Sequence, residues 1–375
     1  MRRVIVLVFV LASLAPVGAS LDAARDALSA VERAQRAAVS NKPETPFKLA
    51  TFEAGGKTRL GLVLGARMLD IHGANADLIR KTGVAALAIP GEMRLLIEEY
   101  ARVSPRLYQI ANYFKDIKLE DAPFVFDTGK AAIKAPIKYP YNLLAIAANY
   151  KLHAGEMFRP GSPEQKAAEE ANPDKEDPVF FAKSPRSCII DPGEPFVMPP
   201  GRNIDWEGEL AIVIGKQAFN VTEANAHDYV FGYSIMYDLS DRGGPGRPLT
   251  GMFPGPNWFR GKSRDRSAPF GPFILPKEFV RDPTSFRIVT KVNGAVKQDG
   301  NTKNLIWDEP HMVRFLTSVL TLYPGDVIAS GTPDGVGAGR KPPEFLKPGD
   351  VVTIEIEGIG TLTTPMRAAT PPPTP

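Results

Sequence analysis

The sequence predicts an α+β fold that is mainly β, in which a small mixed region precedes a larger β-rich region. Two observations predict it. From Tyr141 to Pro365, short β-like runs alternate with turns rich in Pro and Gly, which is typical of a largely β domain with few helices. Before Tyr141, a stretch of apolar and polar alternation is followed by longer helical segments, which indicates a small α+β domain.

Composition is that of an ordinary soluble globular protein. The chain has 375 residues, of which 43% are hydrophobic and 23% are charged, enough for one large domain or two smaller ones. Its formal charge of +3 falls to +1 if Arg2 and Arg3 are removed. Nothing therefore indicates a nucleic acid or an anionic membrane as a partner.

The first nineteen residues have the pattern of a cleaved signal peptide. Two arginines precede an apolar run from Val4 to Leu14 that is short for a membrane span, and small residues stand at Val17 and Ala19. An uncleaved anchor is the alternative. We expect an exported protein, periplasmic or secreted, with no stable membrane insertion after cleavage.

The rest of the chain divides into regions that differ in residue composition and pattern. A hairpin is expected around Gly55-Gly56, followed by helices near residues 76–87 and 91–115, and a Pro-punctuated connector, "KAAIKAPIKYP", leads to the β-rich part. The predicted division is a signal peptide at 1–19, a helical tether at 20–45, a small α+β domain at 46–135, the main domain at 141–367 and a disordered tail at 368–375.

Cysteine and histidine are scarce. Cys188 is the only cysteine, so an intramolecular disulfide and a zinc site built from several thiolates are both excluded. Of the four histidines, we expect His72, His227 and His311 to be structural or surface residues. A metal would therefore be held mainly by oxygen atoms.

The segment "IDWEGELAIVIGK", residues 204–216, is predicted to be a buried strand that carries two carboxylates. With a side-chain period of two, Glu207 and Glu209 point to one face, and Trp206, Leu210, Ile212 and Ile214 point to the other. Neighbouring buried carboxylates repel unless a cation or a shared proton compensates them. The alternative is a solvated edge strand with two surface acids.

A second strand, in "YVFGYSIMYDLSDRGG", ends at Asp238, where a Gly-rich loop begins. Three carboxylates, Glu207, Glu209 and Asp238, would suit a hard divalent cation. We expect Mg²⁺, with Mn²⁺ or Ca²⁺ as alternatives.

In "AIAANYKLHAGEM", His153 and Glu156 are three residues apart and lie on one face of a helical turn. A carboxylate beside an imidazole orients it and raises its basicity, as a general base requires. A surface ion pair is the alternative.

Two loops complete the candidate site. In "GTPDGVGAG", residues 331–339, backbone N–H groups and the Thr332 hydroxyl can bind an anionic oxygen, although a plain turn is equally consistent. The long Gly- and Pro-rich loop from Arg242 to Lys262 is typical of a lid or a binding loop. Its Arg242, Arg247, Arg260 and Lys262 can hold a carboxylate substrate or be solvated.

From Tyr141 to Pro365 the chain resembles the fumarylacetoacetate hydrolase family, in particular its smaller members that act on acylpyruvates, oxaloacetate and related 2-oxo acids. The motifs occur in the family's order: "NYKLHAGE", "FFAKSPRSCIIDPGEPFVMPP", "IDWEGELAIVIGK", "VFGYSIMYDLSDR", "GKSRDRSAPFGPFI", "YPGDVIASGTPDGVG" and "LKPGDVVTIEIEGIGTL". The resemblance implies a mixed β-sandwich roll as the catalytic domain, preceded by the small α+β domain, and a homodimer.

The resemblance also implies roles for single residues. Glu207, Glu209 and Asp238 match the family's metal ligands, and His153 with Glu156 matches its catalytic dyad. Lys262 matches a catalytic lysine near the metal. The residues expected to bind substrate are Tyr150, Lys183, Arg242 and Thr332.

This sequence also departs from the family pattern. In "SDRG", residues 240–243, an acid precedes Arg242 and the family's acid after the arginine is missing. The loop to Lys262 is longer than usual, and the charged segment "MFRPGSPEQKAAEEANPDKEDP" stands where the family has a mobile lid. A signal peptide is a further departure, since the family is mostly cytosolic. The changes in the arginine motif, the loop and the charged segment concern the substrate more than the metal.

We therefore expect a divalent-metal-dependent hydrolase that cleaves a C–C bond in a small acylpyruvate-like or diketo acid. A decarboxylase, lyase or isomerase with the same chemistry is the first alternative. A periplasmic binding protein without turnover is the second.

Overall fold

The structure, a computed structural model, describes residues 39–117, 122–157, 160–245 and 257–369. Within them strands outnumber helices, and the fold is α+β and mainly β, as predicted. The predicted signal peptide lies outside the described residues, as does most of the predicted tether; its described part, residues 39–45, contains no helix. None of the helices in the described ranges is both long and apolar enough to span a membrane.

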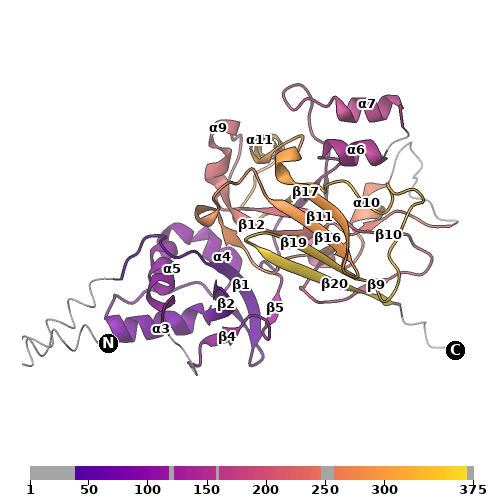
Figure 1. Ribbon diagram of the computed structural model, residues 1–375. Helices are drawn as coiled ribbons and strands as arrows, with labels where there is room; N and C mark the ends of the chain where they lie inside the picture. The colour runs from indigo at the N-terminus through magenta and orange to yellow at the C-terminus, as the bar shows by residue number, and fades with distance from the viewer. Residues whose placement is uncertain (1–38, 118–121, 158–159, 246–256, 370–375) are drawn as a thin grey trace, which may run out of the picture.

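The N-terminal region is a five-stranded sheet with three helices, drawn in indigo and purple in Figure 1. The predicted hairpin is present, and the sheet order is β4 (Val125–Asp127), β3 (Arg67–Asp70), β2 (Lys57–Leu64), β1 (Lys48–Ala54) and β5 (Ala132–Lys134). The helices are α3 (Ile71–Thr82), α4 (Met93–Glu98) and α5 (Tyr100–Phe114).

These helices differ in their limits from the sequence prediction. Helix α3 begins earlier than expected because the Asp70 carboxylate accepts a hydrogen bond from the His72 N–H at 3.1 Å and so caps it. It ends at Gly83, whose φ of 70° is left-handed. The second predicted helix is divided at Glu99 into α4 and α5.

Two larger sheets form the β-rich region. The first has the order β15 (Leu275–Pro276), β12 (Val230–Tyr237), β11 (Gly208–Ile214), β18 (Val327–Ala329), β6 (Leu143–Ile146) and β7 (Phe180–Ala182). The second has the order β17 (Ala295–Asn301), β16 (Arg287–Val292), β19 (Val351–Ile356), β20 (Gly360–Ala368) and β9 (Phe196–Met198).

Short elements connect and cover these sheets. Two strand pairs are β10 (Ile204–Asp205) with β13 (Ser240–Asp241), and β14 (Ala268–Pro269) with β8 (Ile189–Ile190). The helices are α6 (Lys151–Met157), α7 (Pro163–Glu169), α8 (Pro185–Cys188), α9 (Glu223–Ala226), α10 (Trp258–Lys262) and α11 (Glu309–Val319), with 3₁₀ turns η1 (His227–Tyr229), η2 (Lys277–Phe279) and η3 (Thr302–Asn304). Helices α6 and α7 lie together at the top of Figure 1, far from the N-terminal region.

Strand β11 is central, and both its faces are buried. Leu210, Ile212 and Ile214 belong to one hydrophobic cluster, which includes Ile288 and Ile354 of the second sheet. Ala211 and Val213 belong to another. A strand with two dry faces needs a nearly continuous apolar sequence, which explains "ELAIVI" and excludes the solvated edge strand.

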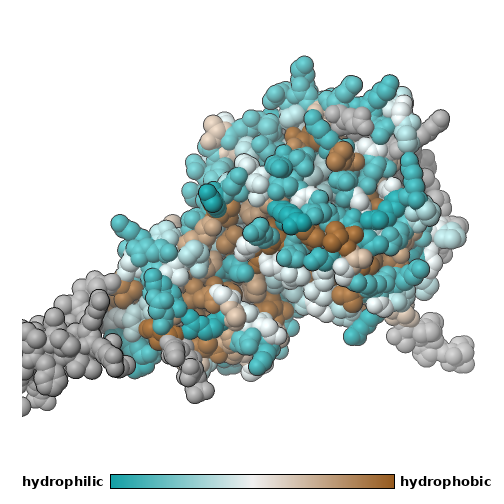
Figure 2. Space-filling model, viewed as in Figure 1, coloured by the Kyte–Doolittle hydropathy of each residue, from teal (hydrophilic) through white to brown (hydrophobic). Residues whose placement is uncertain are grey.

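The second cluster also joins the N-terminal region to the rest, since it contains Leu49 and Leu96 as well as Val213. A bridge between Leu49 and Ile274 crosses the same boundary. The division into two domains stays a prediction. Figure 2 shows mostly hydrophilic residues on the face in view, with smaller hydrophobic groups between them.

Gly208, between the two glutamates, allows the sheets to pack closely. A Cβ atom there would lie 2.2 Å from Thr290 Oγ1 and 3.0 Å from Ile354 Cγ2 of the second sheet. We expect Gly208→Ala to lower the free energy of unfolding by about 1–3 kcal/mol, as overpacked cores do. Thermal or urea unfolding would measure it. Gly91→Ala, with no atom within 4 Å of its added Cβ, is the control, and equal stability of the two variants would contradict the packing argument.

Candidate metal and catalytic site

Glu207, Glu209 and Asp238 come together where β11 begins and β12 ends. The strands are antiparallel with Gly208 opposite Tyr237, so the residues that flank this pair become neighbours. The Asp238 N–H donates to the Glu207 carbonyl at 3.0 Å. One carboxylate oxygen from each acid lies within 4.8 Å of the others, and all three residues are buried.

Two buried lysines contact these acids. Lys262 Nζ lies 2.5 Å from Glu207 Oε2, 2.6 Å from Asp238 Oδ2 and 2.7 Å from Ser240 Oγ. Lys183 Nζ donates to Asp238 Oδ1 at 2.6 Å, and its side chain is fully shielded from solvent. Burial of a lysine is tolerated only beside opposite charge, which these carboxylates supply.

The acids differ in how well their charge is compensated. Burial raises the pKa of Glu207, but the Lys262 ammonium and the Arg242 guanidinium outweigh it, and the net shift is downward. Burial also raises the pKa of Glu209, and the charges of Asp238 and Glu207 add to the increase, so that it lies well above the ordinary value. Glu209 receives a hydrogen bond from the Gly331 N–H at 2.8 Å.

The donor set therefore fits a hard divalent cation. All three groups are carboxylates, their oxygens are close enough to share one ion, and Glu209 lacks a cationic partner among the described residues. A divalent ion would supply that missing charge.

The Gly-rich loop 331–338 binds the protein's own carboxylates through its backbone. The Gly335 N–H donates to Glu156 Oε2 at 2.9 Å, and the Gly337 and Ala338 N–H groups donate to Asp205 Oδ1 and Oδ2 at 2.7 and 3.1 Å. These backbone N–H groups are thus bonded to side chains of this chain, and the predicted binding of a further anionic oxygen by the loop stays a prediction. With the Gly331 N–H, which donates to Glu209, the loop holds three acids: Glu156, Asp205 and Glu209.

Thr332 lies in the same loop. Its hydroxyl donates to the Gly208 carbonyl at 3.0 Å and accepts from Gln298 Nε2 at 2.8 Å, so it ties the loop to the start of β11. The residue is buried and lines the cavity described below.

His153 and Glu156 lie on helix α6, and His153 Nδ1 is 2.9 Å from Glu156 Oε1. His153 is buried, and Glu156 is held from the other side by Gly335. The pair is therefore fixed, in contrast to a mobile surface ion pair. With Nδ1 engaged, Nε2 is the ring nitrogen that can exchange a proton.

Arg242 is positioned by Asp205, a residue that sequence reasoning did not single out. Arg242 Nε donates to Asp205 Oδ2 at 2.9 Å, and its Nη2 donates to Glu207 Oε1. Burial lowers the pKa of Arg242, but Glu207 and Asp205 outweigh this and raise it overall. The signal for Asp205 was available: it is a charged residue within the same dry segment as Glu207.

The acid that precedes Arg242 has a structural role. Asp241 is buried and pairs with Arg202 at 2.9 Å and with Arg264. The altered "SDRG" motif thus adds an ion-pair network at the cavity, since Asp241 is also one of the lining residues.

Tyr150 and Lys183 lie behind the site, and neither lines the cavity. The Tyr150 hydroxyl is buried without a hydrogen-bond partner among the described residues. Burial, with a contribution from the charge of Glu209, raises its pKa. Arg260 is outside the lining as well, and Arg247 lies outside the described residues. The other three histidines are bonded elsewhere: His72 to the Ile89 carbonyl, His227 to Glu309 and His311 to Asp308.

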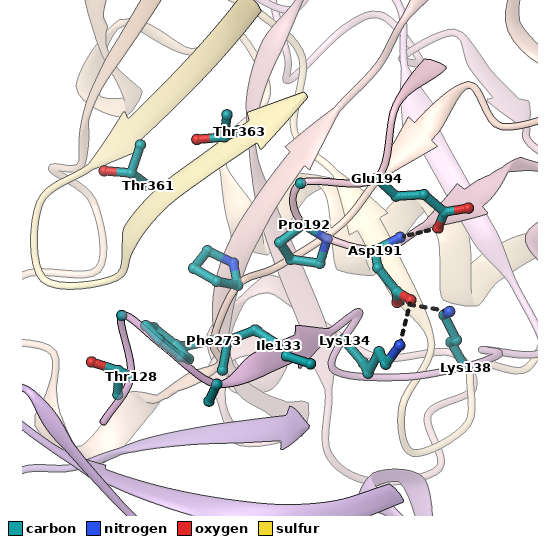
Figure 3. A pocket seen from close by; sticks show the side chains of 15 residues that line it. Thr128, Ile133, Lys134, Lys138, Asp191, Pro192, Glu194, Phe273, Thr361 and Thr363 are labelled. Carbon is teal, nitrogen blue, oxygen red and sulfur yellow. Dashed lines mark hydrogen bonds and ion pairs between the residues drawn. The ribbon is translucent and has the colours of Figure 1, made fainter. Parts of the chain in front are cut away.

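A cavity of about 700 Å³ joins these groups. His153, Glu207, Glu209, Arg242, Lys262 and Thr332 all line it. A second cavity, of about 930 Å³, lies between β5 and β20 (Figure 3). There Lys134 and Lys138 both pair with Asp191, and none of the residues predicted for the site is present.

Comparison with known proteins identifies the family. The model of the fumarylacetoacetate (FAA) hydrolase C-terminal domain matches residues 142–367. The chain belongs to the fumarylacetoacetate hydrolase family. Among family relatives, the oxaloacetate tautomerase YisK of Bacillus subtilis is 32% identical over 84% of this chain and 98% of the relative. The mitochondrial oxaloacetate tautomerase fahd2 of Xenopus laevis is 31% identical over 88% and 92%.

Solved family structures agree. The fumarylacetoacetate hydrolase of Exiguobacterium antarcticum superposes with a TM-score of 0.65 at 30% identity, over 86% of this chain and all of that one. The maleylpyruvate hydrolase of Sphingobium sp. SYK-6, in complex with manganese(II) and pyruvate, has a TM-score of 0.61 at 28% identity, over 86% of this chain and all of that one.

The two glutamates should respond oppositely to neutralisation in metal-free protein. Glu209→Gln removes an uncompensated charge and should raise the melting temperature. Glu207→Gln leaves Lys262 and Arg242 short of a partner and should cost about 1–3 kcal/mol. Both substitutions should weaken Mn²⁺ binding by about tenfold or more; a tenfold loss of affinity corresponds to about 1.4 kcal/mol of binding free energy.

Calorimetry with and without Mn²⁺ measures both effects. Glu357→Gln, which changes an exposed acid on the β19–β20 turn, is the control and should change neither value. Wild-type Mn²⁺ affinity in both site variants would refute the metal assignment.

Proposed function

We propose that this protein is a divalent-metal-dependent hydrolase that cleaves a C–C bond in a small 2-oxo acid with a second carbonyl group, such as an acylpyruvate. One observation carries the proposal: Glu207, Glu209 and His153 line the same cavity, with Asp238 beside the two glutamates and Glu156 bonded to His153. A cation site and a proton acceptor that face one volume are the two requirements of this chemistry.

In this proposal Glu207, Glu209 and Asp238 hold the ion, with Mg²⁺ the expected metal and Mn²⁺ or Ca²⁺ the alternatives. When bound, the ion would supply Lewis-acid stabilisation for oxygen atoms that gain negative charge. The maleylpyruvate hydrolase of Sphingobium with manganese(II) and pyruvate supports the choice of a divalent ion and a 2-oxo acid.

His153 would move the proton. Water adds through its oxygen to the acyl carbonyl carbon while Nε2 takes its proton, and Glu156 holds the ring and stabilises its charged form. The bond from that carbon to the methylene carbon then breaks. The electron pair of that bond stays on the pyruvate unit, and the proton is delivered from Nε2 to the former methylene carbon. One acylpyruvate and one water thus give one carboxylic acid and one pyruvate.

The remaining lining residues would set the charge and the position of the substrate. Lys262 and Arg242 offset the negative charge of the acids, which allows an anionic substrate to approach. Thr332, fixed by its hydrogen bonds to Gly208 and Gln298, is the proposed hydroxyl contact.

Tautomerisation or decarboxylation of a 2-oxo acid is the second candidate, because two similar relatives are named oxaloacetate tautomerases. In tautomerisation the same dyad would move a proton between carbon and oxygen without breaking a C–C bond, whereas decarboxylation would break the bond to a carboxylate carbon, release CO₂ and place a proton on the carbon left behind. Acylpyruvates and oxaloacetate, assayed side by side for pyruvate release, CO₂ release and keto–enol exchange, distinguish these reactions.

Metal removal tests the proposal directly. Turnover of acetylpyruvate with Mg²⁺ or Mn²⁺ should be abolished by EDTA and restored by adding the ion back. Mn²⁺ binding without turnover of any 2-oxo acid would instead favour a non-catalytic binding protein.

The dyad is tested separately. His153→Ala should lower kcat by roughly 10²–10⁴-fold, the usual contribution of a general base. Mn²⁺ affinity should stay unchanged, because the lost group is not a ligand. Glu156→Gln should lower kcat in the same direction, and His311→Ala, on the exposed start of α11, is the control. Wild-type kcat in His153→Ala would exclude the proposed base.

We also propose export, from the predicted signal peptide, and a homodimer, from the family resemblance. Cell fractionation of the full-length chain tests the first, and light scattering of the purified protein tests the second. A protein found only in the cytosolic fraction, or a monomer, would overturn the respective proposal.

A further inference from the structure

One group of residues that line the cavity is apolar, in contrast to the charged lining residues described above. It is formed by the end of β6, the segment that follows α7, and the residues before α11. We call Ala147, Ala171, Val179, Ile306 and Trp307 the apolar wall; all five line the cavity.

Backbone and side-chain contacts join these residues into one surface. The Ala147 N–H donates to the Val179 carbonyl at 2.8 Å. Trp307 Nε1 donates to the Glu176 carbonyl at 3.1 Å, which ties the segment 171–179 to Ile306 and Trp307. Asn149 holds the same pair from behind, because its side-chain oxygen accepts from the Trp307 N–H at 2.8 Å.

The cations that line the cavity are already paired with the protein's own acids. Among the described lining residues, the permanent cations are Arg242 and Lys262, and each is bonded to carboxylates of the protein. Beside the apolar wall the charged residue is Glu176, an exposed acid. A second carboxylate on a substrate tail would meet apolar carbon and a like charge there.

We propose that the apolar wall is a subsite for an uncharged hydrocarbon tail, so that the preferred substrates are 2-oxo acids with an apolar acyl substituent and a single carboxylate. This inference rests on the proposed function, since it concerns the same cavity. A volume of about 700 Å³ also exceeds the needs of a five-carbon acid.

A substrate series tests it. Across acetyl-, butanoyl- and hexanoylpyruvate, kcat/KM should rise roughly fourfold per added methylene, as burial of apolar surface predicts. Pentanoylpyruvate should exceed succinylpyruvate, which carries a terminal carboxylate, by about tenfold or more. A flat chain-length series, or a preference for succinylpyruvate, would overturn the subsite.

Two variants locate the subsite. Ala171→Phe places a larger side chain in the space beside the apolar wall, and it should lower the ratio of kcat/KM for hexanoylpyruvate to kcat/KM for acetylpyruvate. Glu176→Lys places a cation beside the wall and should raise kcat/KM for succinylpyruvate relative to pentanoylpyruvate. The matched control is Glu170→Lys, which changes an exposed acid at the C-terminal cap of α7 that does not line the cavity, and it should leave both ratios unchanged. Equal effects of the two lysine variants would refute the location.

Binding separates the subsite from the reaction. The 2-oxoalkanoates from 2-oxobutanoate to 2-oxooctanoate lack the second carbonyl and cannot be hydrolysed. Their affinity for Mn²⁺-loaded protein, measured by calorimetry, should rise with chain length and exceed that of 2-oxoadipate. A rising series without any acylpyruvate turnover would support the subsite and overturn hydrolysis. Turnover of acylpyruvates with no chain-length dependence in binding or kinetics would support hydrolysis and overturn the subsite.

Discussion

Four carboxylates and three cations share a dry volume at the start of β11 and the end of β12, and their mutual compensation is the constraint on which the site depends. The acids are Asp205, Glu207, Glu209 and Asp238, and the cations are Lys183, Arg242 and Lys262. Removal of a paired member, such as Glu207 or Lys262, leaves a buried charge without its partner, which is among the most costly changes in a protein interior. The excess of acid lies at Glu209, where the proposed metal would bind.

The fold provides this arrangement through ordinary strand geometry. An antiparallel pair places residues distant in sequence side by side, and a central strand with two buried faces keeps water away from them. Gly208 then lets the second sheet approach so closely that the acids on either side of it have little room to move. Packing and electrostatics therefore constrain the same three residues, 207–209.

Local sequence patterns were sufficient to predict part of this site. Strand periodicity placed Glu207 and Glu209 on one face, and helical spacing paired His153 with Glu156, because both relations depend only on neighbours in the chain. The position of Asp205 in a dry segment marked it as unusual, but its role could not be predicted, because its partners include the N–H groups of a loop more than a hundred residues away. The fully paired state of Arg242 was missed for the same reason: a sequence shows charges but does not show which of them meet.

The loop 331–338 holds its acids by main-chain donors, and this makes its contribution invisible to ordinary alanine scanning. Replacing the side chains of Val336 or Ala338 leaves every N–H in place. Gly335 and Gly337 are fixed by space instead, because a Cβ atom would lie 2.2 Å from the Lys297 carbonyl oxygen and 1.9 Å from that of Glu344. Only proline, which has no N–H, deletes one donor at a time. The loop therefore acts on its acids through the path of its backbone, which Gly335 and Gly337 keep in place.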